Sequence, residues 1–157
     1  MTLDEILLQK LSDWHPDAGR HTFSESAAGW AVNVVVDRQD TVGCLVVDLS
    51  LTRTAIEPPT DLTLRAWAER IAGRASGLLE SLKVLEIDDT HSVAVLRSDK
   101  PARKGETIAY YEVRLTGTTA ASVRRYQIIA KANQPREQVA FAVTHEALAK
   151  LVGDIAG

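Results

Sequence analysis

The stretch TIAYYEVRLTGTTAASVRRYQIIAK, residues 107–131, decides the fold that we expect for this chain. Two runs rich in tyrosine, valine, isoleucine and threonine flank a Gly/Thr/Ala turn, a composition typical of a long antiparallel hairpin. Apolar and polar residues alternate along both runs, which indicates a sheet with one buried face. By this alternation we expect Tyr111 and Tyr126 in the core and Tyr110 on the outside.

The rest of the chain supplies further strands and three helices. Alternating patterns predict strands over residues 20–25, 30–37, 42–52, 83–88 and 91–97. Apolar residues at helical spacing predict three helices, with stripes that run from Leu3 to Trp14, from Leu64 to Leu82 and from Phe141 to Ile155. We expect the last helix to open at Asn133-Gln134-Pro135, because proline is favoured in the first helical turn. The basic segment 98–105 is predicted to be a loop.

This order of elements, α-βββ-α-ββββ-α, favours an α+β fold. We expect a single domain over residues 1–157, with one antiparallel sheet of about six to seven strands and helices packed on one face. A parallel doubly wound sheet would need a helix after nearly every strand, and the pattern lacks those helices.

Composition narrows the class of protein further. The chain has 157 residues, of which 45% are apolar and 25% charged, as is ordinary for a globular protein. A single cysteine, Cys44, excludes an internal disulfide and fits a reducing compartment. The N-terminus lacks the basic region of a signal peptide, and no apolar run approaches the ~20 residues that cross a bilayer. We therefore expect a cytoplasmic protein that does not bind membranes.

The charge is distributed unevenly. Residues 1–96 hold 8 basic and 15 acidic side chains, whereas residues 97–136 hold 9 basic and 3 acidic ones. Such asymmetry can mark a surface for an anionic partner, nucleic acid or an acidic protein. The candidate anion-binding residues are Arg97, Lys100, Arg103, Lys104 and Arg124. The alternative is a solvated sheet face that pairs with the acidic part of the same molecule.

The sequence contains no recognisable catalytic constellation. Glycine-rich phosphate loops and the G-x-S-x-G elbow are missing, and the four histidines lack metal-ligand spacing. Cys44 lies among valines and leucines, where a thiol is inert, and Asp88-Asp89 is typical of a turn. We expect no catalytic residue, no metal and no cofactor. An enzyme stays an alternative that needs a polar pocket joining His91 or His145 to a carboxylate.

The sheet face that points away from the helices is the most informative candidate site. We expect the helices to cover the side of Trp30, Leu45 and Tyr111, with Cys44 on the other side. The outer face then mixes apolar, aromatic and arginine side chains, a composition typical of interfaces. The candidate partner-binding residues are Val35, Val46, Tyr110, Arg114, Arg125 and Ile129. Partial cover of this face by the first or last helix is an equal alternative.

The leading hypothesis is a non-enzymatic interaction or chaperone-like module, homodimeric, that binds a protein partner through its open sheet face or an edge. We do not expect nucleic acid to be the main partner.

The element order in a small acidic chain resembles the type III secretion chaperone-like fold. The resemblance covers most of the chain as element order, although this sequence has an additional hairpin and shares no motif with the family. It implies an acidic homodimer that holds an extended segment of a client protein, and it assigns no residue a role.

Overall fold

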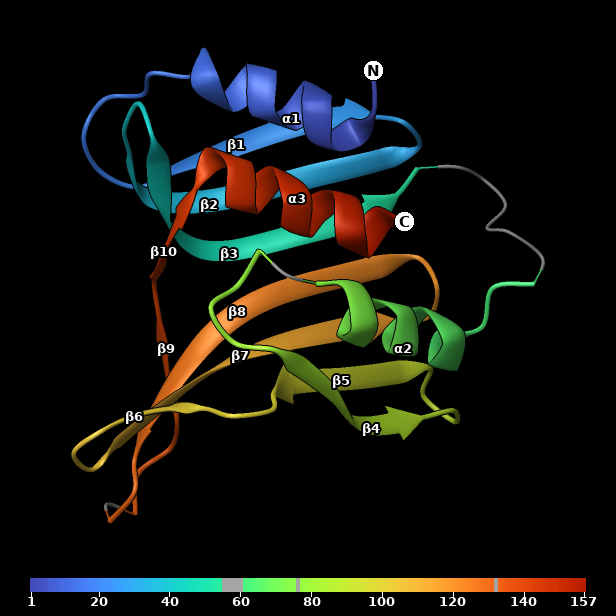
Figure 1. The fold of residues 1–157 in the computed structure, drawn as a ribbon, viewed down its shortest axis with the longest axis vertical. Coiled ribbons are helices and arrows are strands. Elements are labelled where there is room, and N and C mark those ends of the chain that lie inside the picture. The colour runs from blue at the N-terminus through green and yellow to red at the C-terminus, as the bar shows by residue number, and fades with distance from the viewer. Residues whose placement is uncertain (55–60, 76, 132) are drawn as a thin grey trace.

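Strands of one antiparallel sheet account for most of the ordered elements in the computed structural model, which describes residues 1–54, 61–75, 77–131 and 133–157 (Figure 1). The strands follow one another as β1-β2-β3-β8-β7-β5-β4, with the short β10 beside β3, β6 beside β7 and β9 beside β8. Their bounds are β1 His21–Ala27, β2 Trp30–Gln39, β3 Gly43–Arg53, β4 Leu82–Asp88, β5 Val93–Ser98, β6 Ala102–Lys104, β7 Thr107–Thr116, β8 Ala120–Ile129, β9 Glu137–Val139 and β10 Phe141–Thr144.

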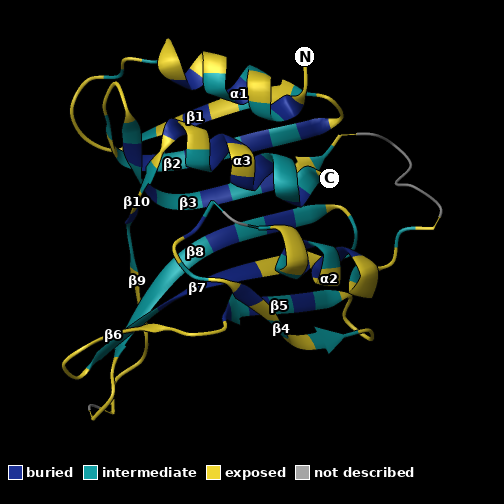
Figure 2. Ribbon diagram, in the orientation of Figure 1, coloured by how far each residue is buried: buried dark blue, intermediate teal, exposed yellow. Residues whose placement is uncertain are grey.

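Three helices cover one face of this sheet: α1 Leu3–Ser12, α2 Leu64–Arg74 and α3 His145–Ala156 (Figure 1). Each helix turns an apolar stripe toward the strands, and the residues of the stripes are buried (Figure 2). The indole Nε1 of the fully buried Trp67 in α2 donates a hydrogen bond to the carbonyl oxygen of Ile155 in α3, at 2.8 Å. This bond satisfies a polar group inside the core and fixes the two helices relative to each other.

The opposite face of the sheet carries no described helix (Figure 1). The predicted α+β class and one-sided helix cover are therefore confirmed, and the alternative of an outer face partly covered by the first or last helix is wrong. We call this uncovered side the outer face.

The predicted number of strands and their order are wrong. The described residues form a ten-stranded sheet rather than one of six to seven strands, and seven strands rather than four follow α2. One additional strand is β6, which pairs with the start of β7 inside the segment predicted as a loop. The others are β9 and β10, in the segment predicted as helix.

The last helix begins ten residues after Pro135, at His145, with Thr144 as its N-cap. The hydroxyl of Thr144 accepts a hydrogen bond from the backbone N–H of Ala147 at 3.0 Å. Phe141 is buried as expected, but on a strand, because residues 137–144 lie where β3 and β8 offer unpaired backbone. Tertiary pairing thus overrides the helical spacing of Phe141, Thr144 and Leu148.

The helix predicted up to Leu82 is also shorter. It ends at Arg74, and Leu82 begins strand β4. Leu78 and Leu82 are buried as the stripe predicts, but Leu79 is 91% exposed. The helical spacing of the leucines therefore predicted the burial of Leu78 and Leu82 correctly, but the burial of Leu79 and the local structure wrongly.

A β-bulge in β3 changes which residues face the helices. Val35 pairs with Asp48, yet the next residue, Val36, pairs with Val46, so Val47 is an extra residue in β3. The bulge puts Val46 and Cys44 on the same side as the buried Leu49 and Leu51. The placement of Val46 and Cys44 on the outer face is wrong, and Leu45, which was expected in the core, lies on the outer side opposite Arg38.

The turn between β7 and β8 sets the register of the long hairpin. Thr116 pairs with Ala120 across a three-residue turn in which Gly117 has a φ of 53°, a conformation that glycine adopts readily. Odd-numbered residues therefore pair with odd-numbered ones, so Tyr111 lies opposite Arg125, and Tyr110 opposite Tyr126. Tyr111 is buried as predicted, but Tyr126 belongs to the outer face, contrary to the prediction.

Arg125 and Ile129 consequently lie on the helix side, not on the outer face. The Arg125 guanidinium stacks 4.2 Å from the centre of the Tyr111 ring and forms an ion pair with Glu80 at 3.1 Å. Ile129 pairs with Thr107 near the free end of the hairpin and is 49% exposed.

β9 and β10 fill a gap where β8 diverges from β3. Close to the turn, β3 pairs with β8 from Leu49 to Thr52; farther along, β8 pairs with β9 and β3 pairs with β10. At Gly43, β3 and β10 lie so close together that a Cβ atom would collide with the carbonyl oxygen of Val143.

The assignment of faces predicts that the same substitution, valine to threonine, destabilises the protein far more on the helix side than on the outer face. Val46→Thr puts a hydroxyl into a fully buried site and should lower the free energy of unfolding by about 1–3 kcal/mol. Val35→Thr, on the outer face, should change it by less than about 0.5 kcal/mol. Urea denaturation of both variants measures the difference, and equal effects would contradict the assignment of faces.

Candidate functional site

Charged residues of alternating sign cross the outer face from strand to strand. In this row, which we call the charge row, Asp48 of β3 is followed by Arg124 of β8, Glu112 of β7 and Arg97 of β5. The Arg97 Nε lies 2.9 Å from the Glu112 Oε2, and the Arg124 Nε lies 3.3 Å from the Asp48 Oδ1. Opposite charges on neighbouring strands stabilise this register.

A third arginine, Arg136, reaches the charge row from the segment just before β9. Its guanidinium lies 3.7 Å from the centre of the Tyr126 ring, 2.6 Å from the Glu112 Oε2 and 3.3 Å from the Tyr110 hydroxyl. Arg97 covers the Tyr110 ring in a similar way, at 5.1 Å. These contacts explain why Glu112 is only 6% exposed on an uncovered face.

Glu112 is ionised under ordinary conditions. Burial alone raises the pKa of its carboxyl group, but hydrogen bonds from Arg136 and Arg97 more than offset this, so the net pKa is lowered. The hydrogen bond to Glu112 likewise raises the pKa of Arg136 above its usual value. Both partners therefore keep their charges.

A hollow of about 280 Å³ lies next to the charge row. We call it the arginine pocket, and it is lined by Glu112, Arg114, Ser122, Arg124, Tyr126 and Arg136. Arg114 and Ser122 face each other across β7 and β8. Arg114 is exposed, and among the described residues its guanidinium has no hydrogen bond or ion pair. Three guanidinium groups around one carboxylate give the hollow a positive charge.

A second hollow of about 300 Å³ shares Arg114 with the arginine pocket. Its other lining residues are Glu86, Asp88, His91, Val93 and Val95, so it combines two carboxylates with two apolar side chains. We call it the acidic hollow. His91 Nδ1 lies 2.7 Å from Asp88 Oδ2, but the histidine side chain is 76% exposed and Asp88 also accepts the backbone N–H of His91. This geometry is that of a turn between β4 and β5, as predicted for Asp88.

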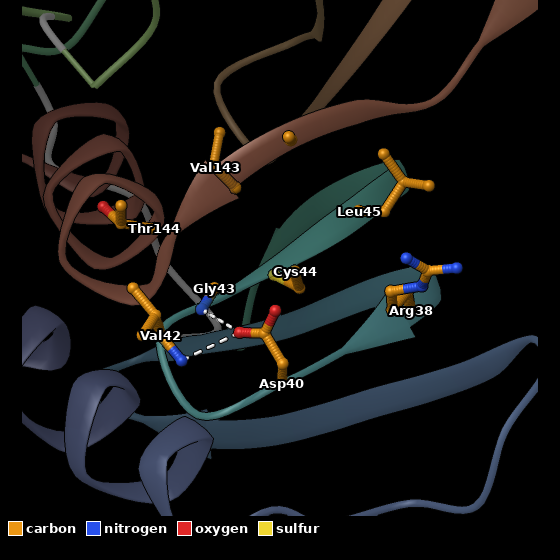
Figure 3. Close-up of a pocket in the computed structure, with 9 residues that line it drawn as sticks. Arg38, Asp40, Val42, Gly43, Cys44, Leu45, Val143 and Thr144 are labelled. Atoms are coloured by element: carbon orange, nitrogen blue, oxygen red, sulfur yellow. Dashed lines mark hydrogen bonds between the residues drawn. The ribbon is translucent and has the colours of Figure 1, made fainter.

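A third hollow, of about 430 Å³, lies between the β2–β3 turn and β10 (Figure 3). The carboxylate of Asp40 accepts backbone hydrogen bonds from Val42 and Gly43, both at 2.8 Å, and so serves the turn. Burial raises the pKa of the Cys44 thiol to about 12, which leaves it protonated and a poor nucleophile. The inert character expected for Cys44 fits this environment.

His145 is buried at the start of α3, and its Nε2 lies 3.1 Å from the side-chain oxygen of Gln39. Burial lowers its pKa, although the nearby Asp40 acts in the opposite direction. Within the described part of the chain no cluster of His, Cys, Asp or Glu could hold a metal ion, and no helix is long and apolar enough to cross a membrane.

The structure gathers only some of the residues singled out from the sequence. Val35, Tyr110 and Arg114 lie on the outer face as expected, whereas Val46, Arg125 and Ile129 do not. Of the candidate anion-binding residues, Arg97 and Arg124 belong to the charge row. The other three are exposed on or near β6, away from the arginine pocket: Lys100, Arg103 and Lys104.

Sequence reasoning placed Asp48 on this face correctly but missed Ser122, Tyr126 and Arg136 as members of the site. Ser122 and Tyr126 would follow from the correct strand register, which depends on the length of the β7–β8 turn. No sequence signal pointed to Arg136, because the segment that carries it was predicted to be helical.

Fold and site together define an α+β protein with an open antiparallel sheet and an arginine-lined hollow on its bare face. Comparisons with protein-family models, with curated proteins and with solved structures find no match to this chain. They do not test the likeness to the type III secretion chaperone-like fold, which stays a prediction.

The charge row predicts a specific dependence of stability on pH. Because the pKa of Glu112 is lower in the folded chain, its stabilising effect is present above the unfolded pKa of about 4.3 and is lost as the pH falls through the folded value. Glu112→Gln should lower the free energy of unfolding by about 1–3 kcal/mol at neutral pH, and this difference should shrink toward pH 3.

Urea denaturation at several pH values measures this effect. Glu106→Gln is the matched control, because Glu106 pairs with Lys131 on the surface and should make no measurable contribution. A Glu112→Gln effect that stays constant from neutral to acidic pH would show that the Glu112 charge is not the cause.

Proposed function

We propose that this chain is a non-enzymatic binding module that holds a protein partner on the outer face of its sheet. One observation supports this above all: the face is bare, yet it brings four arginines and two tyrosines together over β5, β7 and β8. Arginine and tyrosine are enriched in protein interfaces, where they combine large contact area with hydrogen bonding.

The charges on this face favour an acidic partner segment. Arg97, Arg114, Arg124 and Arg136 outnumber the two carboxylates of the charge row, Asp48 and Glu112. The whole chain, by contrast, carries a net charge of −3. An acidic group is therefore attracted to this positive area and repelled by the negative charge of the rest of the surface, which directs an acidic partner to the outer face.

The alternative of nucleic acid has less support. Base stacking needs an open aromatic ring, and here Arg97 and Arg136 already cover Tyr110 and Tyr126. Lys100, Arg103 and Lys104 form a separate exposed basic group, which would supply salt-dependent contacts with phosphates but no readout of bases.

A homodimer and a cytoplasmic location belong to the same proposal. Strand β1 lies at one edge of the sheet. It pairs with β2 along one side in an unbroken seven-residue register, and no described strand pairs with its other side. Such a regular edge is suited to pairing with a second copy, whereas β4, at the other edge, is interrupted by a register shift after Val84.

Retention on charged polymers tests the binding proposal. The chain should be retained on immobilised poly-glutamate at low salt, and Arg114→Glu combined with Arg124→Glu should abolish the retention by reversing two charges of the outer face. Arg65→Glu is the matched control: it changes an exposed arginine on α2, over the other face of the sheet, and should have little effect.

Equal loss in the control would mean that only net charge matters, which contradicts the proposal. Stronger retention on a single-stranded oligonucleotide than on poly-glutamate would support the nucleic-acid alternative instead.

Sedimentation equilibrium over a wide range of concentrations tests the homodimer. The chain should sediment as a dimer, and Thr22→Lys combined with Ser26→Lys on β1 should shift it to monomer, because edge lysines oppose strand pairing. Glu86→Lys on β4 is the control and should leave the dimer intact. A strict monomer at every concentration would refute the dimer.

A further inference from the structure

The arginine pocket contains hydrogen-bond donors that no described residue satisfies. Arg114 and Ser122 line the same hollow from paired positions on β7 and β8, and neither side chain has a hydrogen-bond partner among the described residues. Arg124 uses its Nε and one terminal nitrogen on Asp48 at 3.3 and 3.4 Å and forms a further hydrogen bond with the side chain of Tyr126, which leaves two of its five N–H groups. These free donors lie side by side, and each would bind an oxygen atom.

The one acid of the pocket does not neutralise these donors. Both oxygens of Glu112 already accept hydrogen bonds from Arg136, and its Oε2 accepts one from Arg97 as well. Arg97 and Arg136 therefore occupy Glu112, and Arg114 forms no ion pair with a described residue, although Glu86 and Asp88 line the adjoining acidic hollow. An anion that enters the pocket would meet an electrostatic field that favours it.

We propose that the arginine pocket is an oxyanion-binding site for a phosphate monoester or carboxylate group, with Arg114, Arg124 and Ser122 as its ligands. A guanidinium group binds either oxyanion through two parallel hydrogen bonds, and a hydroxyl completes the set from the opposite strand. Arg136 acts as a positioning residue, because it hydrogen-bonds both oxygens of Glu112 and so keeps this acid from pairing with Arg114. The pocket itself does not depend on the function proposed above. Only the assignment of the oxyanion to a side chain of the partner protein rests on that function.

The acidic hollow extends this site and restricts what fits. It begins at Arg114, continues over Val93 and Val95, and ends at Glu86 and Asp88. Strands in a sheet are about 4.8 Å apart, so the hollow lies roughly 10 Å from the centre of the arginine pocket. A second anion there would be repelled. The two hollows together fit a segment in which an acidic or phosphorylated residue is followed by an apolar residue and then a basic one.

Small probes test the pocket without any protein partner. Phenyl phosphate and benzoate, titrated into the full chain and followed by the NMR signals of the arginine side chains, should shift the Arg114 and Arg124 resonances in a saturable manner. Arg114→Ala should weaken binding of the preferred probe roughly tenfold or more, and Ser122→Ala by a smaller factor.

Two further variants separate binding from charge and from folding. Arg114→Lys keeps the charge but not the two parallel hydrogen bonds, so its affinity should lie between those of the wild type and Arg114→Ala. Arg103→Ala removes an exposed arginine on β6, away from the pocket, and should bind the probes like the wild type. Unchanged backbone spectra would show that each variant is folded.

The two probes and the variants distinguish a phosphate site, a carboxylate site and the absence of a binding site. Preference for phenyl phosphate identifies a phosphate site, and preference for benzoate a carboxylate site. Binding that is equal in Arg114→Ala and the wild type, or no saturable shift with either probe, overturns the pocket. Saturable binding of a probe together with no retention on poly-glutamate would leave the pocket standing and refute the binding of an acidic protein segment.

Discussion

Four residue pairs between β3 and β8 hold the two parts of the sheet together. On one side lie β1, β2 and β3, and on the other β8, β7, β5 and β4, each joined to its neighbours by five to ten residue pairs. The contact places Leu49 and Leu51 beside Val123 and Ala121, so that one continuous core lies beneath three helices. It also brings Asp48 next to Arg124. The outer charge row therefore depends on the same short seam as the core.

The alternation of side chains within each strand could be predicted from the sequence, but the register between neighbouring strands could not. The three helices, the long hairpin and the strands near residues 30–52 and 83–97 follow from local periodicity. Val46 changed face because one extra residue in β3 shifts the pattern, and no local signal marks Val47 as that residue. Tyr126 changed face because a three-residue turn, rather than one of even length, joins β7 to β8. Each error is a shift by one residue, and in a sheet such a shift reverses every side chain beyond it.

Because the register could not be predicted, the arrangement of the charge row and the arginine pocket could not be predicted either. A list of basic residues could be drawn from 97–136, but the sequence does not say which of them meet carboxylates. Arg97 and Arg124 form ion pairs and Arg114 forms none with a described residue, a difference set by the register of β3, β5, β7 and β8. The chemistry of this face thus follows from register more than from composition.

The gap between β3 and β8 has a consequence for how the molecule folds. Phe141 pairs with Val46 and packs edge-on against Tyr111 at 5.3 Å, so the last strand completes a core begun much earlier in the chain. A growing chain on the ribosome would carry β3 with one flank half unpaired until this strand emerges. Pairing between segments so distant in the chain slows folding. Until residues 141–144 emerge, the unpaired backbone of β3 at Gly43–Val46 is open to pairing with other strands.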